Sequence, residues 1–238
     1  MNLNQILELS TVLDNEHFQK VFARSYNGEG YIDEDNGEYI DHSLSSRGIT
    51  VIYRDSQYKK KIRLIVNTYL LMDDAANIDK LVRKLDKRIT EYFDYKYNLG
   101  DFILSGMNFI ADIDVDNPAN VQSYLKVLKR IGKVKGFSPV SREYFDDNAS
   151  FCLSGNSNSI DFLLYDLAAA VMRQYRNTDA GQKKIKSIRG VIRSEVRLMK
   201  PKAIRTYTDA EDIAGQIGEL TENSQDIFMD TFTRIIPF

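Results

Sequence analysis

The sequence predicts an α+β protein with an antiparallel β-sheet covered by helices mainly on one face. β-Branched and apolar runs occur in pairs joined by short polar turns, which is typical of antiparallel hairpins. Amphipathic segments, with apolar residues every three or four positions, lie between these runs, as helices that cover a sheet do. The 238 residues are enough to bury a stable core, and the single cysteine, Cys152, cannot form a disulfide within the chain.

The first half of the chain predicts two hairpins and a helix. Residues 26–39 are rich in Gly, Asn and acids and indicate a loop or a hairpin that turns at Asn36-Gly37. Residues 49–71 contain two apolar runs around a polar turn, which predicts a second hairpin. In residues 77–93 the apolar positions recur at helical spacing, so we expect a helix that packs one face on the sheet.

The second half alternates strands and helices. The pattern predicts strands over residues 102–116, 150–155, 159–166 and 188–199, and helices over 120–132, 167–175 and about 209–235. Hairpin strands interleaved with helices in this order favour the α+β class.

The charges are grouped along the chain and suggest three segments. An acidic N-terminal segment, residues 1–46, has nine acids against two bases, and an acidic helical tail, residues 206–238, has seven acids against one base. Between them lies the predicted core domain, residues 47–205, in which residues 173–205 carry eleven bases and two acids. This basic block predicts a phosphate-binding surface, but charge blocks that pair with one another in the fold would give the same pattern.

Several classes of protein find no support in the sequence. A signal-like N-terminus and an apolar run of about 18 residues or more are missing, which predicts a cytoplasmic protein with no membrane partner. His17 and His42 are isolated, so we expect no zinc site. Glycine-rich phosphate loops of the Walker or Rossmann kind are also missing.

Three aspartates follow one face of the strand predicted at residues 102–116. Asp112, Asp114 and Asp116 alternate with apolar residues, so neighbouring carboxylates on that face lie roughly 6 to 7 Å apart. Such oxygens suit a shared Mg²⁺ or Mn²⁺ if a neighbouring strand adds a third ligand. The alternative is a solvated strand end that runs into a turn at Asn117-Pro118.

The strand predicted at residues 188–199 carries a similar face of mixed charge. Arg193, Glu195 and Arg197 share one side of it. Glu195 could be a metal ligand or a base, and the arginines have the shape that binds phosphate oxygens. Ion pairing across an exposed sheet face is the alternative.

Tyr165 is the candidate nucleophile. It alternates with Phe162 and Leu164, so its side chain faces away from the residues expected to form the core. A phenol beside a bound cation and an arginine can attack a phosphodiester, because both partners favour the phenolate. The alternative is a packed aromatic side chain with its hydroxyl in water.

Four short motifs follow one another in the second half of the chain: "MNFIADIDVD", "YLKVLKRIGKVKGF", "FCLSGNSNSIDFLLYDLAAAV" and "GVIRSEVRL". Their order resembles the N-terminal domain of rolling-circle replication initiation proteins, which plasmids, filamentous phages and integrative elements encode. The resemblance covers roughly residues 59–200. It implies that Asp112 or Asp114, the Tyr165-Asp166 pair and the Arg193 to Arg197 strand surround a divalent metal. In that family, a tyrosine cuts one DNA strand and stays attached to the 5′ phosphate.

The chain departs from the family's pattern around the tyrosine. Leu167 stands where a lysine is usual, and the loop "SGNSNS" has no basic residue. The family's nucleophile can also be matched to an earlier position, where this chain has Phe151 and Cys152. Either Tyr165 is the nucleophile, or this chain has lost nicking and kept binding.

Together these patterns predict a DNA-binding, replication-initiator-like protein of a mobile element that nicks one DNA strand. The predicted catalytic residues are Tyr165, Arg193 and Arg197, and the predicted ligands of Mg²⁺ or Mn²⁺ are Asp112, Asp114 and Glu195. The alternatives are a non-catalytic domain that binds DNA or a protein on the same scaffold, and a module that binds only protein; a homodimer also stays open. Single-stranded DNA or an origin hairpin would lie along Lys126, Lys129, Arg130, Lys133, Lys135, Lys183, Lys184, Lys186, Arg189, Lys200, Lys202 and Arg205.

Overall fold

A computed structural model describes residues 3–26, 30–56, 59–71, 77–115, 117–131, 134–140, 149–157, 159–175 and 179–236, without the side chains of residues 173–175, 179–181 and 184. The chain forms two compact units. The N-terminal unit comprises residues 4–107 and 200–223, and the C-terminal unit comprises residues 1–3, 108–199 and 224–238. The boundaries of these two units differ from those of the three segments suggested by the charges, because each unit is assembled from separate stretches of chain.

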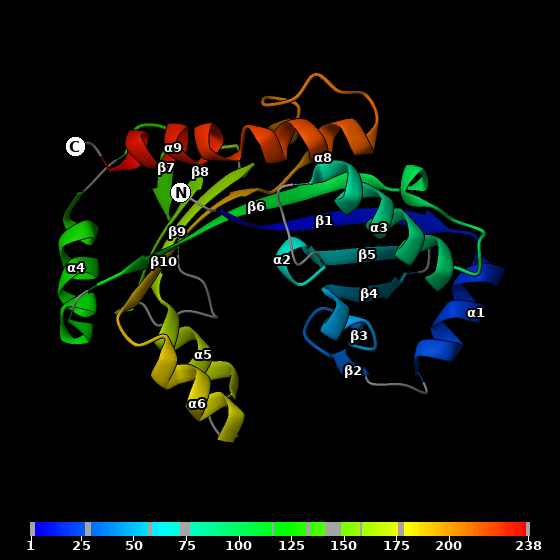
Figure 1. The fold of residues 1–238 in the computed structure, drawn as a ribbon, viewed down its shortest axis with the longest axis horizontal. Helices are drawn as coiled ribbons and strands as arrows, with labels where there is room; N and C mark the ends of the chain where they lie inside the picture. Colours follow the sequence, from blue (N-terminus) through cyan, green and yellow to red (C-terminus); the bar gives the residue numbers. More distant parts are fainter. Residues whose placement is uncertain are drawn as a thin grey trace. The chain divides into compact units, whose positions relative to one another are not determined.

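The N-terminal unit contains a sheet in the order β2-β3-β4-β5-β1-β6 (Figure 1). Both predicted hairpins are confirmed. One turns at Gly37, whose φ is +61°, and the other places Asp55 opposite Lys60. The strands are β1 (Asn4–Leu13), β2 (Gly30–Asp33), β3 (Glu38–Asp41), β4 (Ile49–Asp55), β5 (Lys60–Asn67) and β6 (Ile103–Asp114), the last of which continues into the C-terminal unit.

Gly48 allows the second hairpin to begin. Its φ is +82°, a conformation that side chains with a Cβ rarely adopt. The amide of Asn67 donates to the Gly48 carbonyl over 2.7 Å. A Cβ atom on this residue would lie 2.7 Å from the backbone nitrogen of Leu71, so the start of the hairpin has room only for glycine.

Helices α1 and α3 pack on this sheet. The predicted α3 is confirmed, and the side chain of Asn77 caps it by accepting from the Lys80 amide over 2.9 Å. Phe18 of α1 meets Tyr53 of β4 edge to face, with ring centroids 5.9 Å apart. The helices of the unit are α1 (Asn15–Tyr26), α2 (Thr68–Leu71), α3 (Ile78–Tyr92), α7 (Pro201–Ile204) and α8 (Ile213–Glu222), with short 3₁₀ turns η1 (Ser45–Arg47) and η2 (Leu99–Asp101).

The C-terminal unit contains a sheet in the order β6-β10-β9-β8-β7. The strands and helices predicted for this part are confirmed, except that the predicted tail helix divides at Asn223 into α8 and α9. Helix α6 and strand β7 were not expected. The new elements are β7 (Phe137–Pro139), β8 (Ser150–Gly155), β9 (Ile160–Asp166), β10 (Val191–Leu198), α4 (Val121–Leu128), α5 (Leu167–Tyr175), α6 (Asp179–Ser187), α9 (Ser224–Ile235), η3 (Pro118–Asn120) and η4 (Lys129–Ile131).

Helices contact both faces of the sheet within the C-terminal unit (Figure 1). On one face, Leu163 and Tyr165 of β9 belong to a hydrophobic cluster with Val171 of α5 and Ile185 of α6. On the other face, Phe162 meets Phe232 of α9 at a centroid distance of 5.9 Å. The predicted α+β class with an antiparallel sheet is therefore confirmed, and the face that carries Tyr165 is an interior one.

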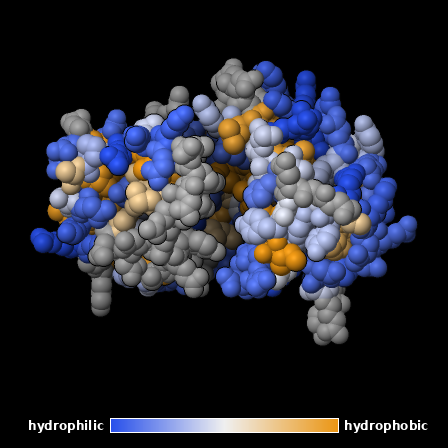
Figure 2. Space-filling model, turned by 90° about the horizontal axis from the view of Figure 1, so that it is seen from below, coloured by the Kyte–Doolittle hydropathy of each residue, from blue (hydrophilic) through white to orange (hydrophobic). Residues whose placement is uncertain are grey.

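The surface is mixed in character. On the side drawn in Figure 2, hydrophobic residues reach the surface in separate small areas between hydrophilic ones. Within the described ranges, none of the helices combines the length and the apolar run that crossing a bilayer requires.

Candidate functional site

Neighbouring strands bring the predicted tyrosine and glutamate together. In the antiparallel pair of β9 and β10, Tyr165 lies opposite Arg193, and Glu195 lies opposite Leu163. Because side chains alternate along a strand, Tyr165, Arg193 and Glu195 share one face of the sheet. The Tyr165 hydroxyl donates a hydrogen bond to Oε1 of Glu195.

Arg197 binds the same carboxylate. Its Nε and Nη2 atoms lie 2.7 and 2.6 Å from Oε2 of Glu195. Glu195 is only 4% exposed, and a carboxylate this deeply buried is stable only when it is paired and hydrogen-bonded. Tyr165 and Arg197 supply that pairing, one at each oxygen.

Arg193 and Asp112 form a second pair on this sheet. Nε and Nη2 of Arg193 donate to the two oxygens of Asp112 over 2.7 and 2.8 Å, a bidentate arrangement that joins β10 to β6. Burial lowers the pKa of Arg193, but the bond to Asp112, together with the interactions with Tyr165 and the negative charges of Asp112 and Glu195, raises that pKa overall. Both predicted catalytic arginines thus have a carboxylate partner within the sheet.

Tyr165 itself is buried, with 6% of its surface exposed. Cys152, Leu163 and Ile185 surround it in the hydrophobic cluster beneath α5 and α6. Burial raises the pKa of the phenol, and the adjacent negative charge of Glu195 raises it further. The hydroxyl is therefore neutral at physiological pH and directs its proton at Glu195.

The expected three-carboxylate metal site is not assembled among the described residues, which contain no group of three or more His, Cys, Asp or Glu placed to hold an ion. Asp112 and Glu195 accept from arginines instead of facing a shared point. Asp114 is exposed at the end of β6, and Asp116 lies outside the described residues. These residues do not fit Mg²⁺ or Mn²⁺ as a three-ligand set in this arrangement, so no chemical step through a metal follows from it.

The residues predicted to bind DNA lie around three separate helices of the chain, α4, α6 and α7. Lys133 and the side chain of Lys184 lie outside the described residues. The others are exposed. They comprise Lys126, Lys129, Arg130 and Lys135 on and after α4, Lys183, Lys186 and Arg189 on and after α6, and Lys200, Lys202 and Arg205 around α7 in the N-terminal unit.

The group on α4 and η4 has the clearest positive character. Residues 117–142 contain six lysines and arginines and no acid. The ion pairs found between described residues leave out Lys126, Lys129 and Arg130. These three cations are therefore available to phosphate groups.

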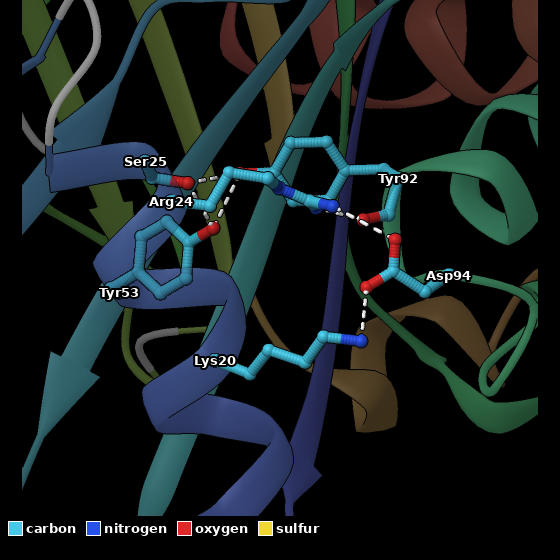
Figure 3. A network of polar contacts seen from close by, with 6 residues as sticks. All are labelled: Lys20, Arg24, Ser25, Tyr53, Tyr92 and Asp94. Atoms are coloured by element: carbon cyan, nitrogen blue, oxygen red, sulfur yellow. Dashed lines mark hydrogen bonds and ion pairs between the residues drawn. The ribbon is translucent and has the colours of Figure 1, made fainter.

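A second polar cluster lies in the N-terminal unit and was missed by the sequence analysis (Figure 3). Ser25 Oγ lies 2.7 Å from the Tyr53 hydroxyl and 2.8 Å from the Tyr92 hydroxyl, and the two phenols also bond to each other. Tyr92 donates to Asp41 over 2.7 Å. Burial raises the pKa of Tyr53 to about 12. Because α1, β3, β4 and α3 each supply one of these four residues, no local sequence pattern could indicate the cluster.

Charged residues cover this cluster on one side. Lys20 and Arg24 of α1 both reach Asp94 at 2.9 Å, and the Arg24 guanidinium lies 5.2 Å from the centre of the Tyr92 ring (Figure 3). A cavity of about 360 Å³ adjoins them, lined in part by Asp41 and Arg88. The hydroxyls of Ser25, Tyr53 and Tyr92 bond to one another, so the cluster ties α1 to α3 and β4.

Comparison with known proteins does not assign this chain to a family. No family model matches the sequence, and no curated protein matches it significantly.

Proposed function

We propose that this protein binds DNA through the sugar-phosphate backbone, with Lys126, Lys129 and Arg130 as the main contacts. The observation that carries the proposal is the exposure of these three cations in a stretch of 26 residues, 117–142, that contains no acid. The resemblance of the strand motifs to replication initiation proteins supports DNA over other polyanions.

The contact would be electrostatic. Each phosphate that a lysine or arginine neutralises releases condensed counterions, so affinity falls as salt rises. Residues 117–142, which include α4 and η4, contribute no negative charge of their own to this contact.

The group around Tyr165 would hold the C-terminal sheet together. Its arginines are bound to Asp112 and Glu195, so these carboxylates offset the positive charge that would otherwise act on a phosphate. Its phenol is neutral and lies under α5 and α6. Binding without strand cleavage is therefore the function that this geometry favours.

The test is the salt dependence of DNA binding. For a labelled single strand, the plot of log K against log salt has a negative slope, to which each phosphate contact contributes about 0.7. The slope should therefore be less steep by about 2 in the triple variant Lys126→Gln, Lys129→Gln, Arg130→Gln. The matched control is Lys80→Gln, Arg83→Gln, Lys87→Gln on α3, which also removes two lysines and one arginine. If both triple variants lose the same DNA affinity, α4 is not the main contact. If the protein does not bind DNA even at low salt, it is a module that binds only protein.

DNA nicking is the second candidate, and the hydrogen bond between Tyr165 and Glu195 favours it. In that reaction the phenol oxygen attacks phosphorus, Glu195 takes the phenol proton, and the departing 3′ oxygen takes a proton from water, which leaves a 5′-phosphotyrosine. Incubation with supercoiled and single-stranded DNA, with Mn²⁺ or with chelator, separates the candidates. Covalent adducts that disappear in Tyr165→Phe would establish nicking, and retarded DNA without adducts supports binding alone.

A further inference from the structure

A largely hydrophobic cavity of about 460 Å³ opens beside α4 in the C-terminal unit. Tyr124 and Val127 of α4, Leu164 of β9, Ile192 of β10 and Phe232 of α9 contribute to its walls. Tyr124 and Val127 are 52% and 61% exposed, so the cavity is accessible from solvent. Leu164 and Ile192 point to the sheet face opposite Tyr165 and Arg193, so the cavity is distinct from the tyrosine group.

Three polar residues also line this cavity: Asp114, Asn117 and Asn120. The Asn117 side-chain oxygen accepts from the Ala119 amide over 3.0 Å, which leaves its amide nitrogen as a donor. The Asn120 side chain makes no capping bond to α4. The cavity thus combines hydrophobic and aromatic walls with amide donors and a carboxylate acceptor.

Cations lie on the same helix and the turn that follows it. Lys126 belongs to α4, and Lys129 and Arg130 belong to η4, directly after the residues that form the cavity wall. A nucleotide presents the complementary groups: a flat base with an apolar face, an edge of donors and acceptors, and a phosphate. The cavity volume is within the range of about 300 to 1,000 Å³ that is typical of small-molecule sites.

We propose that this cavity accepts an unpaired base of single-stranded DNA while Lys126, Lys129 and Arg130 bind the adjoining phosphates. The inference rests on the proposed function and specifies the form of DNA. A base in a duplex would have to be unstacked and unpaired before it could enter, so the protein should prefer single strands. Asp114 can accept from an exocyclic amino group, and the two asparagines can meet the polar edge of the base.

The experiment compares Tyr124→Ala with Tyr124→Phe, which keeps the aromatic wall. The probes are a single strand with one 2-aminopurine and a duplex of the same length. Loss of one stacked base predicts a decrease in single-strand affinity of about 5- to 150-fold for Tyr124→Ala, from ~1–3 kcal/mol per base. Tyr124→Phe should bind within about twofold of the unmodified protein, since the stacking surface remains. Duplex affinity should be unchanged in both.

The outcomes separate this inference from the proposed function. If the protein binds DNA through Lys126, Lys129 and Arg130 but Tyr124→Ala binds single strands normally, the cavity is no base site and the proposed function stands. Equal affinity for single strand and duplex, or 2-aminopurine fluorescence that does not change on binding, overturns the inference in the same way. Failure to bind either DNA at low salt overturns both. The urea concentration at half-unfolding should be equal for Tyr124→Ala and Tyr124→Phe. A difference in affinity between them then reports binding and not a difference in folding.

Discussion

The hydroxyl of Tyr165 donates to the carboxylate of Glu195, whose other oxygen is bound by Arg197. Removing the hydroxyl in Tyr165→Phe leaves one oxygen of a buried carboxylate without this donor. We expect a loss of about 1–3 kcal/mol in the free energy of unfolding, the usual cost of an unsatisfied buried group. Urea denaturation measures this loss, and the affinity for DNA should not change.

The matched control is Tyr95→Phe, since Tyr95 is 79% exposed and its hydroxyl faces water. Its unfolding free energy should stay within about 0.5 kcal/mol of the unmodified protein. A Tyr165→Phe variant as stable as this control would show that Glu195 does not depend on the phenol.

The stability of the protein should decrease in alkaline solution because buried tyrosines resist ionisation. The pKa of Tyr53 is raised to about 12 by burial, and burial also raises the pKa of Tyr92. A folded-state pKa above the unfolded value of about 10 gives stability that is complete below pH 10 and is lost as the pH rises toward 12. Urea denaturation at several pH values should show this decrease.

Tyr53→Phe tests the origin of that decrease. The variant loses the hydrogen bond to Ser25 at every pH, but it also loses one titrating group. Its unfolding free energy should therefore fall less steeply between about pH 10 and pH 12 than that of the unmodified protein. If the unfolding free energy of Tyr53→Phe falls as steeply with pH as that of the unmodified protein, groups other than Tyr53 cause the loss of stability in alkaline solution.

Local patterns predicted most of the fold. The turn at Asn36-Gly37 and the helix over residues 77–93 depend on neighbouring residues, and both formed as expected. Strand β1 and helix α1 were overlooked because the acidic charge of residues 1–46 suggested a separate segment, although Leu7, Leu9 and Phe18 are fully buried. Net charge describes the exposed side chains of such elements and does not reveal their buried ones.

The candidate site was predicted in part, for a related reason. Strand alternation placed Tyr165 and Glu195 on one face, and the structure brings them together. Alternation cannot show whether a face is covered. Helix α6, which contributes Ile185 to the cluster around Tyr165, was not expected, so the phenol appeared accessible in the sequence and is buried in the fold.

Gly48 should be far less tolerant of substitution than Gly37, although both have positive φ. A Cβ atom at Gly37 meets nothing within 4 Å, whereas one at Gly48 would lie 2.7 and 2.8 Å from backbone atoms of Leu71 and Asn67. Gly37→Ala should cost about 1 kcal/mol for the conformation alone. Gly48→Ala should cost several times more because the backbone must also shift. Equal losses in thermal unfolding would contradict the overlap at Gly48.

Thr231 offers a stabilising substitution in α9. Its side chain is fully buried, and its hydroxyl has no hydrogen-bond partner among the described residues. Valine has nearly the same shape and a similar helix propensity, so Thr231→Val removes the cost of the unpaired hydroxyl without leaving a cavity. We expect a gain of about 1 kcal/mol in urea denaturation. Thr233→Val is the control, because that exposed hydroxyl donates to the Met229 carbonyl over 2.8 Å and its loss should give no gain. A destabilised Thr231→Val would mean that the hydroxyl is bonded in solution, and the core under α9 would then include a polar contact.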